Sequence, residues 1–173
     1  LHNWENPTEN VRACFEASFQ TLTTFQQQLF SLTTLFSSGD FDQKALIALA
    51  NDSTNHTHLP TLINRDLNIL YRRSLIDTSY TTESGEKRFR LHPLLHEFAA
   101  HKLSVFAYSA IELNSRLIKH YSKVAESLME DQFDQIDRDW ANLLSLIEWS
   151  EQNKRYDLLY SIVSSLTVMQ GGA

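Results

Sequence analysis

The sequence predicts a mostly α-helical fold interrupted by one two-stranded β-hairpin. Residues that break helices are scarce, since only four glycines and three prolines occur among 173 residues. Apolar residues recur at helical spacing along most of the chain, whereas residues 75–92 are rich in β-forming side chains around a turn signal. A hydrophobic content of 42%, with ten Phe, six Tyr and three Trp, supplies a core and excludes a disordered chain.

Four helices are expected before the hairpin, over residues 7–22, 25–35, 41–51 and about 59–72. Pro7 fits the first turn of the first helix, where its missing N–H costs nothing. Asp40 is expected to cap the third helix, because its carboxylate can accept an unpaired N–H of the first turn. The fourth helix is amphipathic, with an apolar face on one side and Arg65 and Asn68 on the other.

The stretch after the fourth helix predicts the hairpin. Residues 75–82 favour a strand, residues 83–86 have turn chemistry, and residues 87–92 alternate polar and apolar side chains. Helices followed by a two-stranded hairpin are the layout of a winged helix. We therefore expect residues 1–104 to form a winged-helix domain.

The chain returns to helix after the hairpin. Pro93 is placed at the first position of the next helix, with His92 as its cap. Further helical patterns predict antiparallel helices joined by short turns, in which Trp140 and Trp149 pack in the core. We expect residues 105–173 to be the truncated start of a tetratricopeptide-like array. Because the chain begins without Met and ends just after a helical pattern, it is expected to be an excised segment of a longer protein.

The sequence contains no recognisable catalytic or metal-binding constellation. Its glycines are nowhere clustered to wrap a phosphate, so the main cradle for a nucleotide is expected outside this chain. His96 and His101 are five residues apart, which does not match the paired histidines of a zinc-protease helix, and His92 and His96 lack a third ligand. Cys14 lies among apolar residues and is expected to be a buried structural thiol. We expect no enzyme activity, no metal and no cofactor in this chain.

A cytoplasmic location without membrane contact is expected. The single cysteine cannot form a disulfide within the chain, which favours a reducing compartment. No signal peptide opens the chain, and its apolar runs are far shorter than the ~20 residues that span a bilayer.

DNA binding is the main alternative for a winged helix. Arg65, Asn68 and Arg72 are the residues that would face a major groove. Residues 11–104 contain nine basic and nine acidic residues, and the whole chain has a net charge of −6. Because DNA-binding domains usually carry a basic face, a helix that faces solvent or a protein partner is the favoured interpretation. A passive protein-interaction scaffold is a third alternative.

Four stretches of the sequence carry a family resemblance. They are residues 11–45, residues 67–76 (LNILYRRSLI), residues 88–99 (RFRLHPLLHEFA) and residues 121–166. The third is the most specific, and it looks like the "y-r-m/l-H-D/P-L-l-r-e-y-A" run of signal-transduction NTPases of the STAND class, the NB-ARC-like and NACHT-like proteins. The last resembles the helical-repeat arm of bacterial members of that class.

The resemblance implies a regulatory role for this chain. In that family the histidine of a Met-His-Asp-like motif reaches the β-phosphate of bound ADP in the resting state, and His92 is the matching position. Leu91 stands in place of the methionine and Pro93 in place of the aspartate. An imidazole at a helix N-terminus is a good phosphate contact, while the alternative for His92 is a helix cap that packs the hairpin. The resemblance also implies a parent ATPase that binds ADP or ATP with Mg²⁺. Its nucleotide-binding core would contact this winged helix, and the helical array would sense a protein partner.

Overall fold

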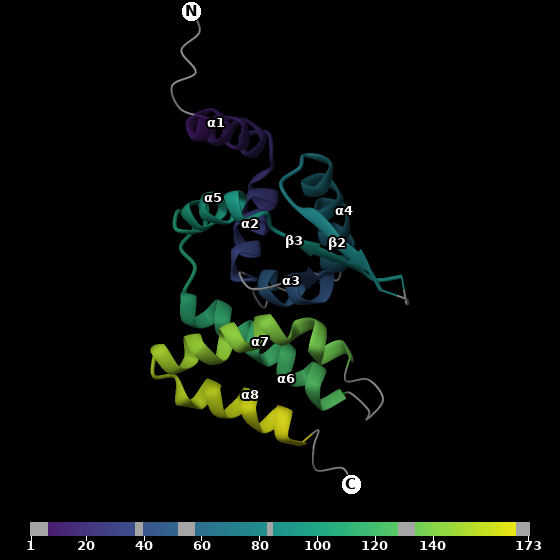
Figure 1. Ribbon diagram of the computed structural model, residues 1–173, viewed down its shortest axis with the longest axis vertical. Coiled ribbons are helices and arrows are strands. Elements are labelled where there is room, and N and C mark those ends of the chain that lie inside the picture. Colours follow the sequence, from purple (N-terminus) through teal and green to yellow (C-terminus); the bar gives the residue numbers. More distant parts are fainter. Residues whose placement is uncertain (1–6, 37–39, 52–57, 83–84, 128–133, 169–173) are drawn as a thin grey trace, which may run out of the picture.

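The computed structural model describes residues 7–36, 40–51, 58–82, 85–127 and 134–168. In these ranges the fold is mostly helical, with eight α-helices, one short 3₁₀ helix and one small antiparallel sheet of three strands. Figure 1 shows α2, α3 and α4 beside the sheet, the last three helices stacked at one end of the molecule and α1 at the opposite end.

The predicted helices are all present, with ends that differ by a few residues. Before the hairpin the elements are α1 (Pro7–Gln20), α2 (Thr24–Leu32), the 3₁₀ helix η1 (Thr33–Leu35), β1 (Phe41–Asp42), α3 (Gln43–Ala50) and α4 (Leu59–Arg72). They are followed by β2 (Asp77–Thr81), β3 (Lys87–Arg90), α5 (Pro93–Leu103), α6 (Ala110–Ser127), α7 (Asp134–Gln152) and α8 (Tyr156–Val168). The hairpin is confirmed as β2 and β3, although residues 83 and 84 of its predicted turn lie outside the described residues.

The sheet contains a third strand that the sequence did not predict. β1 pairs antiparallel with β3, with Phe41 opposite Phe89, and β2 pairs with the other edge of β3. A strand of two residues is too short to show an alternating pattern. Because β1 occupies Phe41 and Asp42, α3 begins later than expected. Its cap is Asp42, which accepts a hydrogen bond from the N–H of Ala45 at 2.8 Å, so the prediction that Asp40 caps this helix is wrong.

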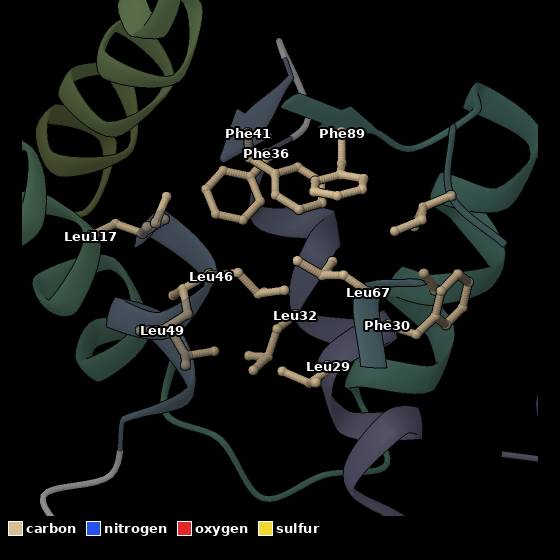
Figure 2. Close-up of a cluster of buried hydrophobic side chains, with 14 of the residues drawn as sticks. Leu29, Phe30, Leu32, Phe36, Phe41, Leu46, Leu49, Leu67, Phe89 and Leu117 are labelled. Atoms are coloured by element: carbon tan, nitrogen blue, oxygen red, sulfur yellow. The ribbon is translucent and has the colours of Figure 1, made fainter. Parts of the chain in front are cut away.

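The core is a single cluster of buried side chains that spans the sheet and the helices on both sides of residue 104. In Figure 2 the rings of Phe36 and Phe41 lie together beneath the sheet, where they stack with centroids 4.6 Å apart. Leu46 and Leu49 of α3 and Leu117 of α6 join the same cluster. Each fully buried side chain of this size contributes about 1.5–3 kcal/mol through removal of apolar surface from water.

The last three helices pack on one another and on α3. α6 contacts both α7 and α8, and its other side lies against α3. Arg116 of α6 also donates a hydrogen bond to the carbonyl oxygen of Leu49 at 2.7 Å, near the end of α3. No helix in the described ranges is long and apolar enough to cross a membrane.

Two side chains that were expected in the core face solvent instead. Cys14 is exposed, because α1 packs through Phe15 and Phe19, whose rings contact Phe98 of α5. The prediction of a buried thiol is therefore wrong. Trp140 of α7 is 45% exposed, so its prediction as a core residue is also wrong.

Candidate functional site

Two contrasting polar side chains lie close together in the sequence around β3. Arg88, within the strand, is buried between the sheet and α7. His92, four residues later, is exposed at the start of α5. An extended segment of this length spans about 13 Å, so a single short stretch of backbone joins a buried ion to a surface imidazole.

His92 caps α5, as the sequence predicted. Its Nδ1 accepts a hydrogen bond from the N–H of Leu94 at 3.2 Å. A ring nitrogen that accepts carries no proton, so the neutral ring holds its proton on Nε2. With the ring exposed, Nε2 is available to donate a hydrogen bond to a group outside the chain.

The exposed surface around His92 is partly apolar. Pro93 is exposed, and Leu94 in the first turn of α5 is 58% exposed. A hollow of about 210 Å³ lies between α5 and α1, and its lining includes the apolar Val11, Leu94 and Phe98 as well as Arg12, Glu97 and His101. The surface near His92 therefore combines a hydrogen-bond donor with apolar and charged side chains.

The buried guanidinium of Arg88 binds two acidic residues. Its Nε donates to Oδ1 of Asp40 at 2.5 Å, and its Nη2 donates to Oδ1 of Asp139 at 2.6 Å. The same Nη2 donates to the carbonyl oxygen of Asp40 at 3.0 Å. Only 3% of the Arg88 side chain is exposed, so these bonds replace the water that the charge would otherwise bind.

Asn142 extends this network within α7. Its Nδ2 donates to the carbonyl oxygen of Asp40 at 2.8 Å, while its Oδ1 is buried without a partner in the described part of the chain. Arg88, Asp40, Asp139 and Asn142 together are named the Arg88 junction. The junction joins the segment before β1, the strand β3 and the helix α7, so it holds the sheet and the helical array together.

Burial governs the protonation of the groups around the junction. Burial alone would lower the pKa of Arg88, but the bonds and charges of Asp139 and Asp40 raise it above its ordinary value, so the guanidinium stays charged. Burial raises the pKa of Asp139, and the hydrogen bond from Arg88 offsets part of that effect. Burial lowers the pKa of His120 on α6, and it raises the pKa of the neighbouring Tyr121.

The three candidate residues for DNA contact all lie on α4, and they differ in the hydrogen bonds that they make within the chain. Arg65 donates from Nε and Nη2 to the carboxylate of Asp66 at 2.9 and 3.2 Å, and Asp66 is fully buried. Asn68 donates to the carbonyl oxygen of Asn64 at 2.8 Å, whereas Arg72 is exposed in the last turn. The Arg65 side chain is still 61% exposed, so its bond to the buried carboxylate of Asp66 offsets its charge without removing it from the surface of α4.

The structure keeps α4 apart from His92. α2 packs against both α4 and α5, and Figure 1 shows these two helices on either side of it. His96, a candidate metal ligand from its spacing to His92, has its Nε2 within 3.0 Å of the carbonyl oxygen of Thr34. No group of three His, Cys, Asp or Glu side chains is placed to hold a metal ion in the described ranges.

Sequence reasoning missed the Arg88 junction, although one signal for it exists. Asp139 stands three residues after Ile136 and four before Leu143, which places a carboxylate on the buried face of α7. A charged residue on such a face is rarely buried unless it is paired. The sequence therefore indicates a buried partner for Asp139, but not which cation it is.

Comparisons of the chain with protein-family models, with curated proteins and with solved structures find no match.

Proposed function

We propose that this chain is the regulatory segment of a cytoplasmic signal-transduction NTPase of the STAND class. In this proposal a winged helix, residues 1–104, contacts the ADP-bound core of the same parent protein. The array that follows, residues 105–173, begins a tetratricopeptide-like superhelix that receives a protein partner. The chain itself carries out no chemistry, and the nucleotide with its Mg²⁺ is held mainly by the core.

The assignment of a winged helix is supported by the order of the elements. α2, α3 and α4 form a helical group that precedes the hairpin of β2 and β3, which is the layout of that fold. The stacking of α6, α7 and α8 supports the assignment of a helical-repeat array.

The observation that carries the proposal is the geometry of His92. Its ring caps α5 through Nδ1 and leaves the Nε2–H free at a helix N-terminus, where backbone dipoles favour an anion. The exposed side chain of Leu94 beside it fits contact with a further protein surface. A donor in this position fits the phosphate contact that the family resemblance assigns to His92.

The Arg88 junction supplies the regulatory part of the proposal. β3 links His92 to Arg88, and Arg88 is bound to Asp139 of α7. A partner that moves α7 therefore strains the strand that positions His92. In this way the array and the nucleotide contact are coupled through one short segment.

The first experiment identifies the nucleotide. The intact protein that contains this chain is purified without added nucleotide and denatured, and the supernatant is analysed by ion-exchange chromatography. We expect about one ADP per chain, since a closed resting state retains its nucleotide. The isolated chain of residues 1–173 is the control and should bind ADP weakly or not at all in calorimetry. An intact protein without nucleotide, and without a P-loop in its sequence, would overturn the proposal.

The DNA-binding alternative predicts a different result. It requires salt-dependent binding of this chain to duplex DNA that is lost in the variant Arg65→Ala with Arg72→Ala. We expect no such binding, because Arg65 is engaged with Asp66 and the chain is acidic overall. Binding that behaves in this way would replace the proposed function with that of a transcriptional regulator.

A further inference from the structure

One face of α7 exposes two large apolar side chains. Trp140 is 45% exposed and Leu144 is 41% exposed. Residues four apart on a helix are neighbours on one face, so these side chains form a continuous apolar surface. The side of α7 that packs into the core is a different one, marked by the buried Leu143 and Leu146.

Carboxylates flank this apolar pair at both ends. At 100° per residue, Asp137, Trp140, Leu144, Glu148 and Glu151 fall within an arc of about 80°. All five side chains are exposed, and we name this surface the α7 stripe. Among the described residues, none of its three carboxylates takes part in an ion pair.

Within α7 itself the stripe contains no positive charge, although Lys154 follows Glu151 just beyond the end of the helix. Arg138 is the one basic residue in the sequence of α7, and it lies about 100° around the helix from Asp137. Residues 105–173 contain six basic and ten acidic residues, so the whole array is acidic. The stripe therefore presents an apolar centre inside a negative field.

We propose that the α7 stripe binds a basic amphipathic helix of a partner protein. Apolar side chains of that helix cover Trp140 and Leu144, and its Lys or Arg side chains pair with Asp137 at one end and with Glu148 and Glu151 at the other. An exposed tryptophan is the kind of residue that dominates such contacts. Two helices that pack face to face make contact through apolar side chains at positions i and i+4, the spacing of Trp140 and Leu144.

The negative charge of the stripe favours a basic helix over a second copy of the chain, a nucleic acid or an anionic membrane. A second copy of the chain packed stripe to stripe would place carboxylates opposite carboxylates, because a two-fold contact uses the same patch twice. Nucleic acids and anionic membranes carry the same sign of charge as the stripe and are repelled by it.

The location of the stripe connects it to the Arg88 junction. The inner side of α7 carries Asp139 and Asn142, and the outer side carries Trp140 and Leu144. The proposal deepens the proposed function and rests on it for the role of the array as a receiver of partners. The binding itself needs neither His92 nor a nucleotide, so failure of the nucleotide experiment and failure of this one are separate results.

The test uses residues 1–173 and a synthetic peptide. The peptide is a helix of Leu, Ala and Lys of about 18 residues, which gives five turns with leucines on one face and lysines beside them. Binding is measured by calorimetry and by the tryptophan emission, which should shift to shorter wavelength as Trp140 becomes covered. We expect saturable binding that weakens as the salt concentration rises.

Paired variants locate the contact. Trp140→Ala with Leu144→Ala should weaken binding about tenfold or more, whereas Tyr156→Ala with Tyr160→Ala, which removes exposed aromatics from α8, should leave the affinity unchanged. Far-UV circular dichroism checks that the variants retain the fold, as expected for exposed positions.

A second pair tests the role of charge. Glu148→Lys with Glu151→Lys should weaken binding and reduce its salt dependence, whereas Glu97→Lys on α5 should not. The proposal is overturned by absence of binding, by equal binding of a peptide with Glu in place of Lys, or by unchanged affinity in the stripe variants. It is also overturned if the chain self-associates and the Trp140→Ala, Leu144→Ala variant does not, since a second copy would then cover the stripe.

Discussion

Removal of the Arg88 side chain is the sharpest test of how the sheet and the array are joined. In Arg88→Met the two carboxylates of the junction lose their cation. Asp139 is almost fully buried and cannot recover its hydration, whereas Asp40 is partly exposed and can. Loss of one partner of a buried ion pair costs about 3–5 kcal/mol, because a charge is left buried and unpaired.

Most of the stability lost in Arg88→Met should be recovered when the carboxylate of Asp139 is removed as well. A buried ion pair replaced by apolar side chains of similar volume is often neutral or stabilising. The double variant Arg88→Met with Asp139→Leu should therefore be more stable than Arg88→Met alone. Lys87→Met, next to Arg88 but exposed, is the matched control and should change the free energy of unfolding by less than about 0.5 kcal/mol.

Urea denaturation followed by circular dichroism measures these differences, and hydrogen exchange locates them. Arg88→Met should accelerate exchange of the α7 amides, because the helix loses its attachment to β3. The reasoning is refuted if Arg88→Met costs less than about 1 kcal/mol, or if the double variant is no more stable than the single one.

Three further predictions concern single positions. Burial lowers the pKa of His120, so the unfolded chain binds a proton first, and the free energy of unfolding should fall as the pH drops below about 6.5. His120→Gln should remove that part of the fall, measured by urea denaturation between pH 7.5 and 5.5. An unchanged dependence on pH would refute the assignment. Asp42→Ala should lower the free energy of unfolding by about 1 kcal/mol, because the N–H of Ala45 loses its cap, while the exposed Asp77→Ala serves as the control in the same thermal melts. Ser74, the residue after the C-cap Arg73 of α4, has a φ of 56°, so Ser74→Gly should stabilise the protein by about 1 kcal/mol, and a lower Tm would contradict this.

The helices were predictable because their information is local. Apolar spacing and the residues at helix starts are read within one or two turns, as the cap at His92 followed by Pro93 illustrates. The hairpin was predictable for the same reason. β1 was not, because two residues carry no period and its pairing with β3 is a long-range contact.

The Arg88 junction could not be predicted from local sequence patterns. Arg88 bonds to residues that lie 48 and 51 positions away in the sequence, and nothing in β3 itself indicates that an arginine is buried. The junction also explains the error at Trp140. Asp139, Asn142 and Ser150 occupy the buried face of α7, which rotates the helix away from the orientation that apolar residues alone would predict.

The central claim is that His92 contacts the phosphate of a nucleotide bound by the parent protein. The most direct measurement is the rate of ADP release from the intact protein, followed with a fluorescent ADP analogue and an excess of unlabelled nucleotide. A hydrogen bond to a charged group is worth about 1.5–3 kcal/mol, so His92→Ala should speed release by roughly ten- to a hundredfold. His101→Ala, which removes another exposed histidine of α5, should leave the rate unchanged. An unchanged rate of release in His92→Ala would contradict the claim.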